Sequence, residues 1–245
     1  MRIHIIACRV LGRELSYLVS KSPNMIEITW QPQGLHEEPA NLKSFLRASL
    51  DAVYDQLERG ICRRAPDYIA LGYGLCSGGI AGLEARDIPI AVPRCDDCIA
   101  LFLGSQERYL ELFNSRKGTY WLNNGWVETS YLLHEGIEKQ LYEEYSRKYG
   151  EDNAEYLMEV NNNWKQHYKN CGFITSDVYD RPEYRRAAEA FAEKNGWTSE
   201  VYEGSSRLLK KLVDGDFFNE EFFVCPPKHR IELTGGRDML RAVPV

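Results

Sequence analysis

Four cysteines are spaced along the sequence so that a fold could bring them to one metal ion. Cys95 and Cys98 form a C-x-x-C pair, Cys76 lies in a glycine-rich segment, and Cys8 follows an apolar run. A C-x-x-C turn lets two sulfurs reach one ion, and zinc and iron-sulfur clusters both bind deprotonated sulfur. The other two thiols come singly from distant segments, which favours a functional site assembled by the fold over a self-contained zinc knuckle. The sequence therefore predicts a metal site of Cys8, Cys76, Cys95 and Cys98.

Two other uses of these thiols stay open. A redox dithiol needs a cysteine whose pKa is lowered, often at the start of a helix. Asp96 and Asp97 stand between Cys95 and Cys98, and their charge would raise the thiol pKa values. Buried cysteine is also common as a small apolar side chain without a chemical role. A redox pair and inert thiols therefore remain alternatives to the metal site.

Other polar residues near the thiols predict the rest of an active site. Asp97 or His36, the latter in a loop after a predicted strand, is expected to move a proton. Arg94 and the main-chain amides of Gly78 and Gly79 are expected to hold an anionic group, because exposed amides suit anions. Ion pairing within the fold and ordinary surface positions are the alternatives for these residues.

The glycine-rich segment does not match the dinucleotide-binding fingerprint. Gly72-x-Gly74 is followed by Ser77 where a third glycine would stand, so a nicotinamide cofactor is not expected. The glycines instead predict close approach of the backbone to a ligand. Tyr73 is expected to help wall the pocket, with core packing as the alternative.

Composition excludes several classes of function. The chain has 245 residues, 44% of them hydrophobic, and a formal net charge of −6 without a basic block, which argues against nucleic acid as a partner. No apolar run approaches the length of a membrane span, and the start of the sequence does not resemble a signal peptide. Seven cysteines is an odd number, and without an export signal reduced thiols are expected. We therefore expect a cytoplasmic protein that binds neither nucleic acid nor membranes.

The elements that must position these residues alternate between strands and helices. Apolar runs predict strands at 2–7, 25–30, 68–73 and 88–92, and apolar residues at helical spacing predict helices ending near 20 and 57. This alternation is typical of a mostly parallel sheet flanked by helices. Because the carboxyl ends of parallel strands border the binding crevice, the cysteines after these strands are expected to converge.

The second half continues the pattern. Helices are predicted at 106–114, 137–149, 154–168, 181–195 and 205–214. Strands are predicted at 171–177, 198–202 and 222–225, and 222–225 is expected to be the last strand of the chain. A loop is predicted at 118–128. The fold class is α/β and Rossmann-like, with a helical insertion around 130–168. One domain over 1–245 is predicted, and two lobes, 1–128 and 169–245, joined by helices in 129–168, are the alternative.

The sequence resembles the uncharacterised family known as domain of unknown function 1638 (DUF1638). The likeness covers most of the chain and rests on specific motifs: Ala7-Cys8, Leu35-His36, Gly72-Tyr-Gly-Leu-Cys76, Pro93-Arg-x-x-Asp-Cys-Ile-Ala-Leu-x-Leu-Gly-Ser105, and Gly118-Thr-Tyr-Trp with Gly125-Trp126. Family members commonly carry histidine where this chain has Asp96, and need not carry cysteine at position 95. The resemblance therefore implies a core ligand set of Cys8, Cys76 and Cys98, with Asp96 or Cys95 replacing a histidine donor.

The resemblance also implies a metabolic setting. Proteins of this kind look like companions of corrinoid-dependent methyltransferases in anaerobic methylated-amine metabolism. The leading hypothesis is thus a metal-dependent enzyme that acts on a small anionic substrate, with zinc ahead of a [4Fe-4S] cluster and methyl transfer as the reaction class. The alternatives are a non-catalytic accessory protein that binds a corrinoid protein or delivers its cofactor, an iron-sulfur enzyme, and a purely structural zinc site. A homo-oligomer is also an expectation.

Overall fold

The computed structural model describes residues 1–130, 136–236 and 238–245, and this part of the chain divides into two compact units. Unit 1 contains Met1–Leu110, Ser176–Tyr179 and Gly204–Val245, and unit 2 contains Glu111–Thr175 and Asp180–Glu203. These boundaries differ from the lobes 1–128 and 169–245. Whether residues 1–245 act as a single domain stays a prediction.

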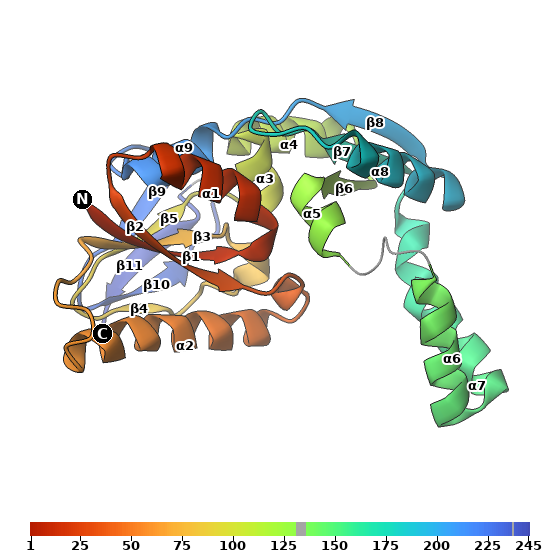
Figure 1. Ribbon diagram of the computed structural model, residues 1–245, viewed down its shortest axis with the longest axis horizontal. Helices are drawn as coiled ribbons and strands as arrows, with labels where there is room; N and C mark the ends of the chain where they lie inside the picture. The colour runs from red at the N-terminus through yellow and green to blue at the C-terminus, as the bar shows by residue number, and fades with distance from the viewer. Residues whose placement is uncertain (131–135, 237) are drawn as a thin grey trace. The chain divides into compact units, whose positions relative to one another are not determined.

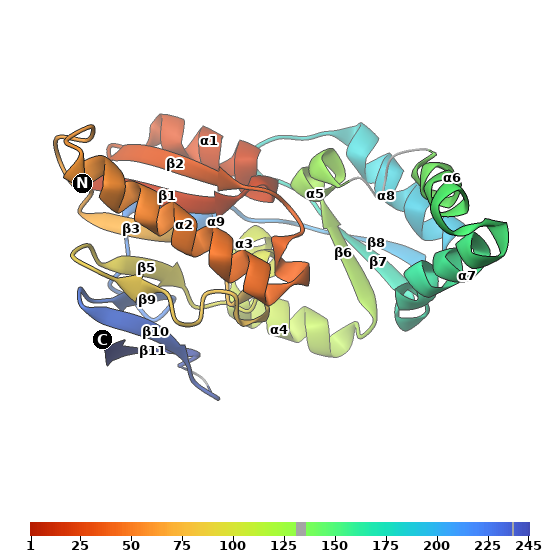
Figure 2. The ribbon, with the colours of Figure 1, turned by 90° about the horizontal axis from the view of Figure 1, so that it is seen from below.

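Unit 1 is built on a five-stranded sheet in the order β2-β1-β3-β5-β9 (Figures 1 and 2). Its strands are β1 (Arg2–Cys8), β2 (Met25–Gln31), β3 (Tyr68–Gly72), β5 (Ile90–Pro93) and β9 (Phe222–Cys225). The first four run parallel to their neighbours, and β9 runs antiparallel to β5. The central strands are almost wholly buried, which is why they read as continuous apolar runs rather than alternating ones. The predicted mostly parallel α/β sheet is confirmed.

Helices cover both faces of this sheet. α2 (Pro39–Glu58) lies along one face, and α1 (Gly12–Lys21) and α9 (Arg207–Asp214) lie on the other (Figure 1). α2 buries Leu42, Leu46, Leu50, Val53 and Tyr54, whose spacing of three and four residues places them on one side of the helix. They pack in a core cluster with buried residues of β1, β3 and β5.

Short elements at the carboxyl ends of the strands complete the site region of unit 1. They are the 3-10 turns η1 (Arg9–Leu11), η2 (Leu35–Glu37) and η3 (Cys76–Gly78), the helix α3 (Cys98–Leu103) and the start of α4 (Gln106–Ser115), of which Gln106–Leu110 belong to unit 1. Each follows a strand or an adjacent loop, so the parallel sheet sets their positions.

The expectation that Phe222–Cys225 is the last strand is wrong. A three-stranded antiparallel sheet follows, in which β10 (His229–Leu233) pairs with β11 (Leu240–Pro244) and with β4 (Glu84–Ala85). Ile231 and Leu240 are buried in the main core cluster of unit 1 and hold this hairpin on the fold. Only one face of the hairpin is apolar, so its sequence signal is weaker than that of the central strands.

Unit 2 contains a parallel three-stranded sheet in the order β6-β7-β8, made of β6 (Thr119–Asn123), β7 (Asn170–Ile174) and β8 (Thr198–Tyr202). α8 (Pro182–Lys194) packs Ala188 and Ala192 on this sheet. α6 (Ile137–Tyr149) and α7 (Glu151–Asn162) form a helical hairpin, followed by the 3-10 helix η5 (Asn163–His167). Residues 131–135 of the predicted insertion lie outside the described residues.

The expected loop at 118–128 is also a regular structure. It forms strand β6 and helix α5 (Asn124–Thr129). Asn123 caps α5, because its side-chain oxygen accepts a hydrogen bond from the Trp126 amide at 3.0 Å. Asn123 and Asn124 are thus the end of a strand and the start of a helix.

Among the described helices, none combines the length and the apolar character that a membrane span requires.

Candidate functional site

The four candidate cysteines lie at one edge of the unit 1 sheet. Cys8 ends β1, Cys76 begins η3 just after β3, Cys95 follows β5, and Cys98 is the first residue of α3. Because β1, β3 and β5 are parallel and adjacent, their carboxyl ends lie at the same edge. The fold therefore brings the loops that carry these thiols together, as the strand pattern predicts.

Backbone hydrogen bonds join the two loops that carry Cys76 and Cys95. The Leu75 amide donates to the Cys95 carbonyl at 2.8 Å, and the Cys76 amide donates to the Asp96 carbonyl at 2.8 Å. At Gly74 an added Cβ atom would lie only 2.5 Å from the Cys95 carbonyl oxygen. Glycine at this position is thus needed for the two loops to touch.

Cys76 sits in a turn with unusual backbone geometry. Cys76, Ser77 and Gly78 have φ angles of 43°, 59° and 83°, so three consecutive residues are left-handed and two of them are not glycine. Such conformations are costly for residues with a Cβ atom, and they concentrate at ligand-binding and catalytic sites. This strain marks the turn as part of a candidate site.

The predicted anion-binding amides are already occupied within this turn. The Gly78 amide donates to the Leu75 carbonyl at 2.9 Å, and the Gly79 amide donates to the Cys76 carbonyl at 3.2 Å. Gly79 also leaves room for the Leu42 side chain of α2, with which a Cβ atom would collide. The structure therefore gives these two glycines a role in the turn and in packing.

Burial shapes the electrostatics of the thiols. The Cys95 side chain is fully buried, and only 7% of Cys76 is exposed. Burial raises the pKa of both thiols well above the ordinary value, and negative charge on neighbouring acids, Asp97 included, raises it further. The pKa of Cys8 is raised by burial as well. Each of these shifts favours the protonated thiol over the thiolate.

Tyr73 places a phenol among the sulfurs. Its side chain is 4% exposed, and burial followed by the nearby thiols of Cys8 and Cys76 raises its pKa. Within the described residues its hydroxyl finds no nitrogen or oxygen partner, and the Cys8 thiol is the group beside it. The predicted pocket position of Tyr73 is therefore next to the candidate ligands.

The titratable groups with the largest effects on the pKa values of these side chains would all be negative if they ionised. For Cys76, Cys95 and Tyr73 they are all acids, namely other cysteines, Asp96 and Asp97. A thiolate formed here would be opposed by its neighbours unless a cation arrived with it. The electrostatics thus match a positively charged ligand better than a reactive thiolate.

Asp97 serves as the N-cap of α3. One oxygen, Oδ1, accepts a hydrogen bond from the Ile99 amide at 2.8 Å, and Oδ2 accepts one from the Tyr109 hydroxyl at 3.3 Å. Burial raises the pKa of Asp97. A carboxyl group with a raised pKa is suited to proton transfer, which is the role that the sequence predicts for it.

Asp96 is held by a residue that sequence reasoning misses. The Gln106 side chain accepts from the Asp96 amide at 3.0 Å and donates to its Oδ2 at 2.7 Å. Tyr109 is also missed, although both residues lie on α4 just after the cysteine loop. Their spacing from the cysteines carries no recognisable motif, so only the fold reveals their contacts with the two aspartates.

The Arg94 guanidinium is bonded to main-chain carbonyls of the fold. Its guanidinium donates to the main-chain carbonyls of Phe222, at 3.2 Å, and Asp238, and it stacks on the ring of Phe223. These contacts join β5 to β9 and to the segment before β11. The structure thus uses Arg94 to hold the fold, and a role toward substrate stays a prediction.

His36 lies in η2, and this turn contacts η3, which carries Cys76. The histidine is partly exposed. The fold thus brings the predicted acid-base residue near the cysteine turn, from a loop that is 40 residues earlier in the sequence.

The chemistry of these donors fits a soft metal ion, because thiolates bind zinc and iron-sulfur clusters. Their side chains do not form a ready coordination shell: within the described residues no group of three or more His, Cys, Asp or Glu side chains is arranged to hold a metal ion. A metal ion could bind here only if the side chains rotated toward one another and released their protons.

The fold and the site define an α/β protein with a cysteine-lined edge of its parallel sheet. The model of the family described as "Protein of unknown function (DUF1638)" matches residues 30–213. This match covers more than half of the chain, which therefore belongs to the DUF1638 family. No curated protein and no solved structure matches the chain significantly.

Proposed function

We propose that this protein is a metal-dependent enzyme whose metal is held by Cys8, Cys76 and Cys98, with Cys95 as a further donor. The observation that carries the proposal is the placement of four cysteines on adjacent loops at one edge of a parallel sheet. Edges of this kind are where α/β folds bind their ligands. Zinc is the metal that we place first and a [4Fe-4S] cluster second.

The charge around the thiols favours a metal over a redox dithiol. A redox cysteine needs a lowered pKa and a positive neighbour, whereas Cys76 and Cys95 have raised pKa values and acidic neighbours. A metal cation supplies the missing positive charge and stabilises the thiolates as they lose their protons. The same acidic surroundings that make a reactive thiolate unfavourable therefore support a metal site.

Two residues are proposed to move protons at this site. Asp97 has a raised pKa and is fixed by the Ile99 amide and the Tyr109 hydroxyl. His36 approaches from η2. A bound metal ion would supply Lewis acidity, and these side chains would accept or donate the proton.

The finer proposal is methyl transfer linked to a corrinoid protein. Its support is the family resemblance alone, and a small anionic substrate has less support than the metal, since Arg94 and the Gly78 and Gly79 amides are bonded within the fold. A non-catalytic accessory protein that delivers or binds a corrinoid cofactor is the second candidate. Metal-dependent association with a corrinoid protein, without turnover, would favour it.

Anaerobic purification followed by elemental analysis and an absorption spectrum tests the metal proposal. We expect about one zinc ion per chain, as in other thiolate sites. A brown preparation with broad visible absorption and matching iron and sulfide would replace zinc by an iron-sulfur cluster. Protein without any bound metal that also fails to take up zinc or iron would contradict the proposal.

Cysteine variants locate the site. We expect Cys76→Ser and Cys98→Ser each to weaken zinc binding by about 100-fold or more, because binding free energies of about 10 to 16 kcal/mol are shared among roughly four ligands. Cys62→Ser and Cys171→Ser are the controls. Cys62 is partly exposed, and the Cys171 sulfur is buried in unit 2. Loss of zinc in the controls as well would assign the metal to non-specific thiol binding.

A further inference from the structure

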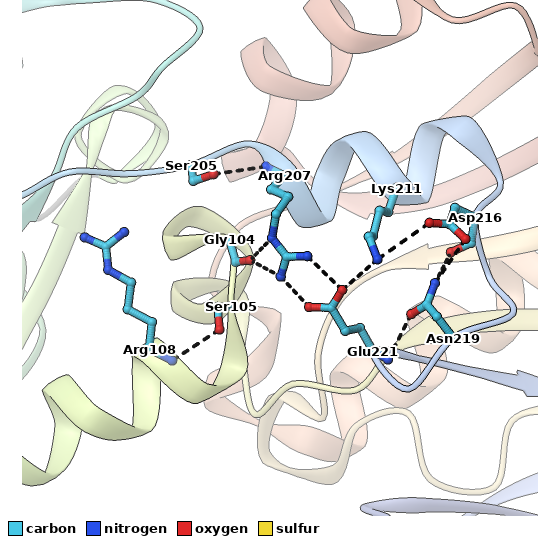
Figure 3. A network of polar contacts seen from close by, with 9 residues as sticks. All are labelled: Gly104, Ser105, Arg108, Ser205, Arg207, Lys211, Asp216, Asn219 and Glu221. Atoms are coloured by element: carbon cyan, nitrogen blue, oxygen red, sulfur yellow. Dashed lines mark hydrogen bonds and ion pairs between the residues drawn. The ribbon is translucent and has the colours of Figure 1, made fainter.

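One arginine holds the end of the cysteine helix. Arg207 donates from both Nε, at 3.1 Å, and Nη2, at 2.8 Å, to the carbonyl oxygen of Gly104 (Figure 3). Gly104 is the left-handed C-cap of α3, the helix that begins at Cys98. The last carbonyls of a helix lack partners within the helix, so a side-chain donor at this point fixes the helix end.

The same arginine is bound to Glu221, the residue just before β9, which holds the other end of the cysteine loop. Its guanidinium forms a two-pronged ion pair with the Glu221 carboxylate, including an Nη1 to Oε2 distance of 2.8 Å (Figure 3). The Glu221 main-chain carbonyl accepts a hydrogen bond from the Arg94 amide at 2.7 Å. Arg94 directly precedes Cys95. Arg207 and Glu221 thus contact both Arg94 and Gly104, the two ends of the segment that carries the C-x-x-C pair.

Neighbouring contacts keep this arrangement in place. The Ser205 amide donates to the Phe102 carbonyl at 2.8 Å, and the Asp177 carboxylate accepts from the Ser206 amide at 3.0 Å. Lys211 forms a second ion pair with Glu221 at 2.8 Å. The pKa of Glu221 falls to about 2 because of its hydrogen bonds with Arg207 and Lys211, with burial opposing them. The start of α9 is therefore a fixed platform for Arg207.

We propose that Arg207 is a positioning residue that, together with Glu221, fixes both ends of the segment Arg94–Gly104 and holds Cys95 and Cys98 in place beside Cys76. The inference rests on the proposed function insofar as it assigns this segment to a metal site. Within the part of the chain that the structure describes, the Arg207 side chain is bonded to Gly104 and Glu221, and it acts on the cysteine segment through these two residues.

Arginine is required here for a geometric reason. Its planar guanidinium presents five donors in a fixed fork, so it serves a carbonyl and a carboxylate at once. Lysine carries a single ammonium group on a flexible stem and cannot reproduce this pair of contacts. A half-exposed ion pair contributes little to stability by itself. A two-pronged ion pair whose arginine also binds a backbone carbonyl is stronger, because its hydrogen bonds are charge-assisted and bidentate.

Alkylation of individual cysteines tests the inference without any metal. The metal-free chain is treated with iodoacetamide, and the labelling rate of each cysteine is measured by mass spectrometry of its peptide. Cys95 and Cys225 are both fully buried in unit 1, but only Cys95 belongs to the clamped segment. The ratio of their rates therefore separates local opening of the cysteine loop from unfolding of the whole unit.

We expect Arg207→Gln to raise the ratio of the Cys95 labelling rate to the Cys225 labelling rate about tenfold. The reason is that losing hydrogen bonds to a charged group shifts the local opening equilibrium of the cysteine loop. Arg207→Lys keeps the charge and should give a smaller rise. Arg241→Gln is the matched control, since Arg241 also donates from Nε and Nη2 to a glutamate, Glu232, in the β10–β11 hairpin. This control should leave the ratio unchanged.

Equal increases in the labelling rates of Cys95 and Cys225 would show that Arg207 stabilises the whole unit and would overturn the inference. Labelling rates that do not change at either cysteine would overturn it as well. If Arg207→Gln does not fold, Arg207→Lys provides the same comparison. A parallel titration with Co²⁺, followed by thiolate charge-transfer absorption, separates the two proposals. Failure of the native chain to bind Co²⁺ or zinc would count against the metal site, whereas the alkylation ratio would still decide the role of Arg207.

Discussion

Gly74 occupies the point where the two cysteine loops meet. A Cβ atom there would lie 2.5 Å from the Cys95 carbonyl oxygen and 2.8 Å from the Asp97 amide nitrogen. Both are backbone atoms, so neither can rotate away. We expect Gly74→Ala to lower the free energy of unfolding by about 1 to 3 kcal/mol, the usual range for overpacking, and to weaken metal binding. Urea unfolding and zinc titration measure the two effects.

Gly12→Ala is the control for this substitution. Gly12 is the first residue of α1, has a helical φ of −56°, and leaves open space around an added Cβ atom. Alanine there should raise the free energy of unfolding by about 0.5 to 1 kcal/mol. Equal stability of the two variants would contradict the close approach of the cysteine loops.

Glu221 makes the stability of unit 1 depend on pH. Its pKa is about 2 in the folded chain, whereas an unfolded glutamate has a pKa near 4.3. The stabilisation is therefore complete above about pH 5 and is lost as the pH falls toward 2. After allowance for solvent screening of this one-third-exposed side chain, about 1 to 2 kcal/mol should disappear.

Unfolding free energies at pH 7 and pH 3 measure this contribution. Glu221→Gln should lower stability at pH 7 and should flatten the acid dependence relative to the native chain. Glu232→Gln, which removes a carboxylate paired with Arg230 and Arg241 in the β10–β11 hairpin, should change the acid dependence less. The same slope in the native chain and in Glu221→Gln would rule out this role for Glu221.

At the scale of elements, α3 depends on its cap. The Asp97 carboxylate accepts a hydrogen bond from the Ile99 amide at the start of a helix of only six residues. We expect Asp97→Ala to cost about 0.5 to 2 kcal/mol of stability, and Asp97→Asn to cost little, because asparagine is an equally good cap. Thermal unfolding compares the two variants.

The same pair of variants separates capping from chemistry. If Asp97 moves a proton, Asp97→Asn should fold as well as the native chain and yet lose activity in any reaction found for the protein. Retained activity in Asp97→Asn would leave Asp97 with the capping role alone.

Some elements could be predicted from the sequence, and others could not. β1, β3 and β5 are buried on both faces, so their apolar runs predict them directly. β10 and β11 were missed because charged residues interrupt their apolar pattern, and β6 because only three apolar residues lie between Thr119 and Asn123. An isolated stretch of sequence does not show that a neighbouring strand will complete its hydrogen bonds.

Some features of the candidate site could likewise be predicted from the sequence, and others could not. The cysteines could be placed at strand ends because chain order and strand pattern fix the edge of a parallel sheet. The occupied amides of Gly78 and Gly79 could not be foreseen, because they depend on the left-handed turn at Cys76 and Ser77. Arg207 was missed because its partners are more than ten residues away in the chain.

At the scale of the whole molecule, each unit has its own hydrophobic core. Unit 2 is organised around Phe173, Leu122, Trp197 and their neighbours, whereas the larger cluster of unit 1 includes Leu71. We expect Phe173→Ala to cost about 3 to 5 kcal/mol and to speed hydrogen exchange mainly in β6, β7 and β8. Hydrogen exchange followed by mass spectrometry resolves the two units.

Leu71→Ala is the reciprocal variant and should speed exchange mainly in β1, β3 and β5. If both variants speed exchange equally throughout the chain, the two units unfold as one cooperative block, and the single predicted domain over 1–245 is the better description.

The cysteine loops and the residues that hold them are made at different times on the ribosome. All four candidate ligands lie within the first 98 residues, whereas Arg207 and Glu221 follow more than 100 residues later. At a synthesis rate of about 5 to 20 residues per second, the nascent chain carries all four thiols for roughly 5 to 25 seconds before Arg207 and Glu221 are added. A growing chain in this interval holds accessible sulfur in an incomplete sheet. If these thiols bind a metal ion as proposed, we expect the ion to bind the finished polypeptide, and we expect the unfinished chain to be sensitive to oxidation of its cysteines.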